Sequence, residues 1–160
     1  MTSRTNATTF TTLSDREIAM ERVFEAAREL VFEAYTDPRH IPHWWGPRGM
    51  TTVVETMDVR PGGAWRYVQH DQEGNEYGFR GEYREVVPPA RLVSTLEFEG
   101  MPGLILVNTA IFEEVDGKTK LTVTSLFASG DDLTGMIDSG GEAAARESWD
   151  RLAELLETLK

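Results

Sequence analysis

The sequence has no cysteine, few basic residues and no long apolar run. Without cysteine, the chain can form neither a disulfide nor a thiolate-based catalytic or metal site. Lys and Arg number 16 against 27 Asp and Glu, and the formal net charge of -11 disfavours both nucleic acid and an anionic membrane as partners. No apolar run can span a bilayer, and the first residues lack the apolar stretch of a signal peptide. We therefore expect a cytoplasmic protein.

Catalytic and cofactor motifs are missing as well. The sequence contains no Gly-x-Ser-x-Gly elbow, no phosphate-binding loop and no dinucleotide fingerprint, so we expect no cofactor. His40 and His43 can share one side of a short helix, but no third ligand with suitable spacing is nearby. We therefore predict no metal site. An enzymatic activity is the less favoured prediction, because catalysis lacks a motif.

The length of 160 residues fits one domain with its own core. Residues 1–15 are rich in Thr and Ser and are predicted to form a flexible tail, with a short strand around Thr8–Thr12 as the alternative. Residues 16–160 are predicted to form the single domain. A homodimer is compatible with a domain of this size, although no sequence element specifies one.

Hydrophobic periodicity predicts a strand, two helices, six further strands and a long helix. The first strand covers residues 18–24, and helical spacing follows in residues 26–35. Pro42 and Pro47 limit the second helix to a short one. The six strands are predicted at residues 51–59, 64–70, 76–87, 91–98, 104–115 and 118–127. Short turns between them, such as Asp116-Gly117, predict an antiparallel meander.

A long C-terminal helix is predicted over residues 131–159. Its apolar face is bulky near the C-terminus and small around Gly141 and Ala144. The glycine pair at 140–141 has two interpretations: a kink with close packing on the sheet, or an empty volume between helix and sheet. The predicted fold is α+β, with a curved antiparallel sheet of six to seven strands around this helix and two short helices between the first two strands.

Four motifs follow one another along this predicted fold: Trp44–Pro47, Asp58–Gly63, Gly81–Val93 and Glu147–Leu156. In this order they resemble the activator of heat-shock-protein-90 ATPase homologue-like domains of the START-like, or SRPBCC, superfamily. The resemblance covers about residues 17–159 and implies the helix-grip fold with a deep hydrophobic cavity. It implies no fixed reaction, because relatives include polyketide cyclases, lipid carriers and co-chaperone domains. Relatives commonly carry a Met near the position of Gly141, so its absence here implies a larger pocket.

Aromatic residues alternate along two of the predicted strands. Trp65, Tyr67 and Gln69 share one strand face, and Phe79 and Tyr83 share the corresponding face of the next strand. Gln69 is polar on an apolar face, and a strand end is the favoured explanation. The predicted ligand-binding residues are Trp45, Trp65, Tyr67, Phe79, Tyr83, Ile137, Gly141, Ala144 and Trp149. Ordinary core packing is the alternative for each tryptophan, because burying one stabilises the fold by roughly 4–6 kcal/mol.

Glu55 and Tyr83 are the candidate catalytic residues. Glu55 shares a predicted strand face with Val53 and Met57, and on a concave face it would be a cavity carboxylate able to act as an acid or base. Exposure at a sheet edge is the favoured alternative. Asn108 is a weaker candidate of the same type.

The function predicted from these features is binding of a small apolar or aromatic ligand between the sheet and the C-terminal helix. A cavity enzyme of the polyketide cyclase/dehydrase or hydrolase type is the first alternative. A co-chaperone-like protein-binding domain is the second.

Overall fold

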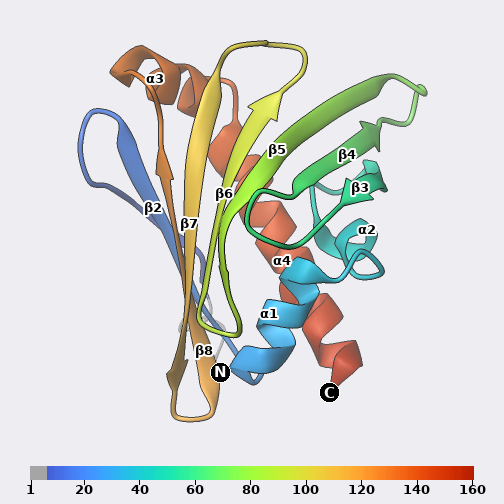
Figure 1. The fold of residues 1–160 in the computed structure, drawn as a ribbon, viewed down its shortest axis with the longest axis vertical. Coiled ribbons are helices and arrows are strands. Elements are labelled where there is room, and N and C mark those ends of the chain that lie inside the picture. Colours follow the sequence, from blue (N-terminus) through green and yellow to red (C-terminus); the bar gives the residue numbers. More distant parts are fainter. Residues whose placement is uncertain (1–6) are drawn as a thin grey trace.

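The computed structural model describes residues 7–160 and confirms an α+β fold in which a curved antiparallel sheet faces a long C-terminal helix (Figure 1). The strands are β1 (Thr9–Thr12), β2 (Glu17–Phe24), β3 (Thr51–Met57), β4 (Ala64–His70), β5 (Glu76–Val87), β6 (Arg91–Phe98), β7 (Ile105–Val115) and β8 (Lys118–Leu126). The helices are α1 (Arg28–Thr36), α2 (Ile41–Trp44), α3 (Gly130–Asp138) and α4 (Gly141–Leu159). None of these helices is both long and apolar enough to cross a membrane.

The sheet has eight strands in the order β1-β2-β8-β7-β6-β5-β4-β3, and each neighbouring pair is antiparallel. Six to seven strands were expected, and the additional one is β1, whose Thr9 lies opposite Glu21 and whose Thr12 lies opposite Ile18. The prediction of a flexible tail over residues 1–15 is therefore wrong for residues 9–12. The part of that prediction that covers residues 1–6 lies outside the described residues.

The chain turns between β7 and β8 as its sequence predicts. Asp116 and Gly117 both have positive φ angles, 53° and 78°, which is the conformation that a two-residue hairpin turn requires. Val115 lies opposite Lys118 across this turn. The connections from β3 to β8 are similarly short, so the predicted antiparallel meander is confirmed.

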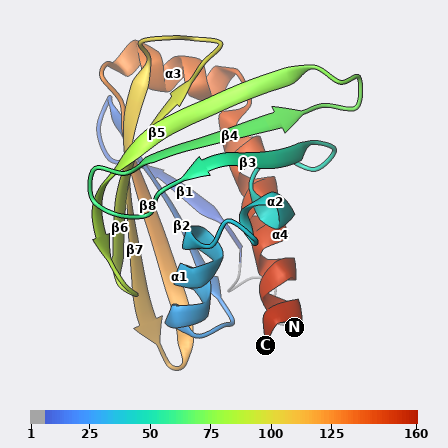
Figure 2. The ribbon, with the colours of Figure 1, turned by 45° about the vertical axis from the view of Figure 1, so that its right-hand side comes forward.

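The C-terminal segment forms two helices instead of the single helix predicted over residues 131–159. Ser129 begins α3 by accepting a hydrogen bond from the Asp132 backbone N–H at 3.1 Å. The Ser139 N–H closes it on the Gly135 carbonyl, and Gly140 then adopts a left-handed φ of 89° that no helix continues through. Figure 2 shows the result: α3 crosses one end of the sheet, and α4 runs along its concave side.

The main core lies where α1, α2 and α4 pack on the concave side of the sheet. Trp149 of α4 is almost completely buried and meets the ring of Phe24 edge to face, with 5.5 Å between ring centroids. Phe112 of β7 lies 5.1 Å from Phe32 of α1 in a similar arrangement. The first contact holds α4 against the sheet and the second holds α1 against it, whereas the N-terminal part of α4 lies over the cavity described next.

Candidate functional site

A cavity of about 480 Å³ lies between the concave face of the sheet and the helices α2, α3 and α4. Its wall is mostly apolar and aromatic, and it includes all four tryptophans of the chain. Eight of the nine predicted ligand-binding residues lie in the wall: Trp45, Trp65, Tyr67, Phe79, Tyr83, Gly141, Ala144 and Trp149. The ninth, Ile137, lies outside it with 37% of its surface exposed, because the break at Gly140 ends the helical face that was extrapolated from α4.

The turn after α2 carries Trp44 and Trp45, and α4 holds this turn in place. The Ser148 hydroxyl donates to the Trp44 carbonyl at 3.0 Å and accepts from the Gly46 N–H at 3.1 Å. Arg151, one helical turn further along α4, donates to the Gly46 carbonyl at 2.9 Å. Polar groups of the turn that would otherwise be buried without partners are satisfied in this way. The turn is therefore fixed relative to the helix that forms one wall of the cavity.

Trp45 is the centre of an aromatic cluster in the wall. Its ring meets Trp65, Tyr67 and Phe79 edge to face, with centroid distances of 6.3, 5.0 and 5.1 Å. The three partners come from β4 and β5, where Tyr67 lies directly opposite Phe79. The alternation predicted for these strands therefore places the aromatic side chains on the concave face. Tyr77, at the end of β5, differs because its hydroxyl donates to Asp71 in the adjacent loop at 3.0 Å.

The expected enlargement of the pocket beside Gly141 is absent from the described structure. A Cβ atom on Gly141 would collide with the sulfur of Met136, which reaches across from α3. Met136 also lines the cavity, so it occupies the volume that the sequence suggested was empty. The glycine permits α3 and α4 to approach each other closely, a contact between two helices that neither a kink nor close packing on the sheet had predicted.

Glu55 lies on the outer face of the sheet and not in the cavity. The register of β3 shifts between Val54, opposite Tyr67, and Thr56, opposite Arg66, so Glu55 is the extra residue of a bulge. Its side chain is half-exposed and forms an ion pair with Arg66, which also binds Glu99 at 2.7 Å. Because of the bulge, the predicted face containing Val53, Glu55 and Met57 does not exist. Glu55 is therefore exposed at the edge of the sheet, which was the favoured alternative, and it does not line the cavity.

Three tyrosine side chains supply hydroxyl groups to the cavity wall: Tyr35, Tyr67 and Tyr83. Burial raises the pKa of Tyr83 to about 12, and burial also raises the pKa values of Tyr67 and Tyr35. The Tyr35 hydroxyl accepts a hydrogen bond from the Trp149 indole at 2.8 Å. At neutral pH all three phenols are protonated, so they act as hydrogen-bonding groups and not as bases.

A row of polar side chains crosses the concave face, and the sequence predicted only two of its members as candidates. Tyr83 lies opposite Ser94, Ser94 opposite Asn108, and Asn108 opposite Ser125, on the four adjacent strands β5 to β8. All four line the cavity, and we call them the polar row. The Ser125 hydroxyl donates to the side-chain amide oxygen Oδ1 of Asn108 at 2.6 Å. Only strand register, which is invisible in the sequence, places Ser94 and Ser125 in this row.

Gln69 is a second polar group in the wall. It is the residue before the last one of β4, near the strand end that the favoured prediction gave it, and it is also buried, with 3% of its surface exposed, and lines the cavity. It follows Trp65 and Tyr67 at alternate positions of β4, so its inward direction is the one that strand periodicity gives.

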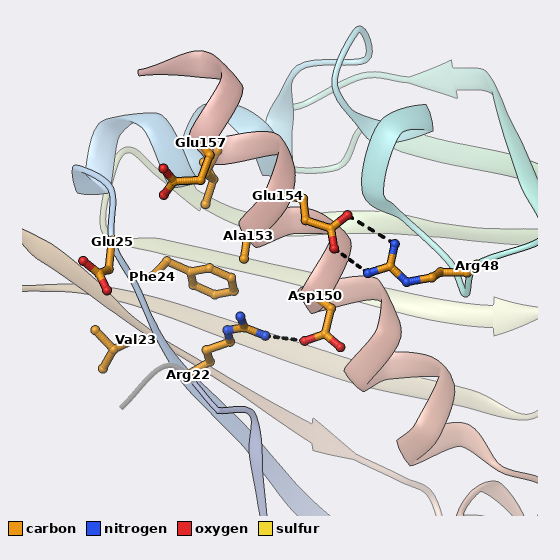
Figure 3. Close-up of a pocket in the computed structure, with 10 residues that line it drawn as sticks. Arg22, Val23, Phe24, Glu25, Arg48, Asp150, Ala153, Glu154 and Glu157 are labelled. Atoms are coloured by element: carbon orange, nitrogen blue, oxygen red, sulfur yellow. Dashed lines mark hydrogen bonds and ion pairs between the residues drawn. The ribbon is translucent and has the colours of Figure 1, made fainter. Parts of the chain in front are cut away.

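Two further hollows lie outside this cavity. One, of about 370 Å³, lies between the end of β2 and α4; there Arg22 binds Asp150 at 2.7 Å and Arg48 binds Glu154 (Figure 3). The other, of about 760 Å³, lies beside the ends of α1 and α4 and includes His40 and His43.

The second hollow gathers groups that could in principle hold a cation. Glu33, Asp37 and His40 bring three potential ligand atoms together, but the His40 ring lies 3.0 Å from the Glu33 carboxylate and Arg39 binds Asp37 in a bidentate manner. His43 is exposed on the same side. In this structure Glu33 and His40 contact each other and Asp37 binds Arg39, so neighbours within the chain engage all three groups.

The comparisons with known proteins agree with this architecture. None of the curated proteins compared with the chain matches it. Among solved structures, a protein from Rhodobacter sphaeroides has a TM-score of 0.88 at 23% identity, covering 94% of this chain and 99% of its own. One from Mycobacterium smegmatis has a TM-score of 0.83 at 26% identity, covering 93% and 96%. The AHSA1 protein from Silicibacter pomeroyi has a TM-score of 0.76 at 25% identity, covering 90% and 99%.

The family assignment comes from a family model that matches residues 25–157, from the end of β2 to the last turns of α4. This range contains the strands β3 to β8 and most of the residues that line the cavity. The chain belongs to the family described as Activator of Hsp90 ATPase homolog 1-like protein, and it has the START/SRPBCC type of domain.

Proposed function

We propose that this protein binds a small hydrophobic or aromatic molecule in the cavity between the sheet and the C-terminal helices. The observation that carries the proposal is a volume of about 480 Å³ with a wall built mainly from aromatic and aliphatic side chains. Cavities of this size and composition are typical of small-molecule sites.

The size of the cavity argues against ordinary imperfect packing. Protein interiors are packed as densely as organic crystals. At roughly 24 cal/mol per Å³, an empty cavity of this volume would cost about 12 kcal/mol, which is comparable with the whole stability of a domain. Water therefore fills it in the absence of a ligand. An apolar molecule that replaces this water gains the free energy of burying its surface.

A thermal-shift screen with aromatic and polycyclic compounds tests the proposal, with two matched variants of α4. Ala144 lines the cavity, whereas its neighbour Ala143 is exposed. We expect Ala144→Phe to fill the cavity and abolish the stabilisation by any compound found, and Ala143→Phe to preserve it. Gly141→Met is a poorer test, because its Cβ atom would collide with Met136 whether or not a ligand binds. Retention of every ligand response in Ala144→Phe would contradict the proposal.

The enzyme alternative has less support. No histidine is found among the described lining residues, and their only carboxylate is that of Glu142, at the N-terminal end of α4. The three cavity phenols have raised pKa values, so they are poor bases at neutral pH. The wall is equipped to bind and orient a molecule, and it lacks an evident group for proton abstraction.

The protein-binding alternative rests on the family description, which names the activation of the Hsp90 ATPase. Among the described residues, the large exposed apolar side chains, such as Val53, Val87 and Met101, lie on separate elements and form no evident docking face. Stimulation of a chaperone ATPase by the purified protein would favour this alternative. A homodimer and a cytoplasmic location are separate proposals, which sedimentation and cell fractionation test.

A further inference from the structure

We infer that the molecule bound in the cavity is uncharged, with an apolar body and two separate hydrogen-bonding groups, one for Gln69 and one for the polar row of Tyr83, Ser94, Asn108 and Ser125. The inference rests on the proposed function and specifies the chemical class of the ligand. It depends on three features of the wall: a buried amide without a partner among the described residues, a band of polar groups in which Asn108 and Ser94 retain unpaired atoms within that part of the chain, and the near absence of charge.

The first feature is the side-chain amide of Gln69. This residue is 97% buried in β4 and lines the cavity, yet within residues 7–160 its amide group has no hydrogen-bond partner. Its nitrogen packs against the Cα of Gly46, where a Cβ atom would collide with it. Water in the free cavity can hydrogen-bond to this amide, but a ligand that displaces the water and offers no partner would leave the amide buried and unsatisfied, which is costly. A ligand group that pairs with the amide avoids this cost.

The second feature is the polar row. Ser125 donates to Asn108, but the Asn108 amide nitrogen and the Ser94 hydroxyl have no partner within the described part of the chain. Apolar residues flank the row on both sides: Leu92, Ala110 and Val123 are opposite one another on one side, and Leu96 and Leu106 on the other. A polar band between two apolar bands recognises a polar substituent at a defined position on an otherwise apolar molecule.

The two polar features are well separated. Gln69 is on β4 and Asn108 is on β7, and β5 and β6 lie between them. Three strand spacings of roughly 4.8 Å separate them by about 14 Å across the strands, and the six residues of β5 between Tyr77, which lies opposite Gln69, and Tyr83 in the polar row add about 20 Å along the strands at roughly 3.3 Å per residue. One substituent of a small ligand cannot reach both positions. The ligand therefore carries two hydrogen-bonding groups on different sides of its apolar body.

The third feature is charge. The described residues that line the cavity include no Lys or Arg, and the only charged side chain among them is the carboxylate of Glu142. The whole chain carries a net charge of -11. A carboxylate ligand such as a fatty acid would lose its hydration without gaining a cationic partner, which is strongly unfavourable. The wall thus selects neutral hydroxyl, carbonyl or amide groups.

Calorimetric titration with three probes of one skeleton tests the inference: biphenyl, 4,4′-dihydroxybiphenyl and biphenyl-4,4′-dicarboxylate. We expect the dihydroxy probe to bind at least tenfold more tightly than either of the others. Gln69→Met and Asn108→Leu should each weaken the dihydroxy probe about fivefold, the value of one neutral hydrogen bond, and leave biphenyl unaffected. The matched control is Gln72→Met, in the exposed loop after β4, which should change nothing.

The outcomes separate this inference from the proposed function. Binding of the dicarboxylate as tightly as the dihydroxy probe would overturn the inference, as would an equal loss of biphenyl and dihydroxybiphenyl binding in both variants. In either case a cavity ligand would still be shown. If none of the three probes binds the wild-type protein, the proposed function itself is contradicted. Circular dichroism establishes that each variant is folded, and Asn108→Leu provides the test if Gln69→Met is not.

Discussion

The side-chain amide of Gln69 lies directly against the Cα of Gly46, where the chain passes from α2 to β3. Gly46 also has a φ of 103°, a conformation that L side chains rarely adopt. Gly46→Ala therefore combines backbone strain with a collision. We expect it to lower the free energy of unfolding by about 2–4 kcal/mol, measured by urea denaturation.

Gly62→Ala is the matched control, because Gly62 has a φ of 85° but nothing within 4 Å of an added Cβ. It should cost only the strain of the backbone, on the order of 1 kcal/mol. The double variant Gly46→Ala/Gln69→Ala should recover the part of the loss that comes from the collision. If Gly46→Ala and Gly62→Ala lower the free energy of unfolding equally, the Gln69 side chain moves away from the added methyl group without an energetic cost.

Gln69→Met should stabilise the protein in the absence of ligand. The substitution replaces an amide that has no partner among the described residues, and so depends on cavity water, by an apolar side chain of similar length, and we expect the free energy of unfolding to rise by up to about 1 kcal/mol. A gain in stability together with a loss of binding is characteristic of a residue kept for function. Thermal unfolding with and without dihydroxybiphenyl measures both effects, and a clear loss of stability would mean that the amide has a structural role.

Alkaline pH should unfold the protein through its buried tyrosines. Burial raises the pKa of Tyr83 from 10.0 to about 12, so between these values the unfolded chain has lost a proton that the folded chain retains. Stability is then constant below pH 10 and falls as the pH rises, by about 1.4 kcal/mol per pH unit for one such group. Tyr83→Phe should reduce the slope of the free energy of unfolding against pH by the contribution of one titrating proton. An unchanged slope would contradict the assignment of this contribution to Tyr83. Tyr67 and Tyr35 add to the effect in the same direction.

The ion pairs of Figure 3 should differ in their contribution to stability. The Arg22 side chain is 11% exposed, and its Nε atom has no partner within residues 7–160, so Asp150 compensates a largely buried charge. Asp150→Ala should cost about 1–3 kcal/mol. Both side chains of the Arg48–Glu154 pair are more than half exposed, and Glu154→Ala should cost less than about 0.5 kcal/mol. Similar losses in the two variants by urea denaturation would contradict this reasoning.

The fold could be predicted because its signals are local. Alternation of apolar residues defines β2 to β8, and Asp116-Gly117 fixes one hairpin. The break between α3 and α4 was harder to predict: a glycine pair fits a kinked helix as well as a terminated one, and the left-handed φ of Gly140 distinguishes them. β1 was weighed only as an alternative, because four residues provide too little alternation.

Residues of the cavity wall could be predicted only where the pattern within a single strand was sufficient to show which face a side chain is on. Trp65 and Tyr67 follow strict alternation, and the structure places them in the wall. Glu55 is exposed at the sheet edge, as the favoured prediction stated, but it does not share a face with Val53 and Met57, because a bulge interrupts alternation without leaving a signal in the sequence. Met136 fills the space beside Gly141 from a different helix, so that contact depends on tertiary structure. The same is true of Ser94 and Ser125, whose neighbours are defined by pairing between strands.

The four tryptophans of the cavity wall should also make the intrinsic fluorescence of this protein sensitive to cavity occupancy. Since no tryptophan lies elsewhere in the sequence, the indole emission of the native protein arises entirely from around the cavity, without a background from distant sites. A molecule that enters the cavity and displaces water makes the surroundings of these indole rings less polar. The emission should therefore shift to shorter wavelength. Occupancy can thus be followed in the unlabelled, unmodified chain.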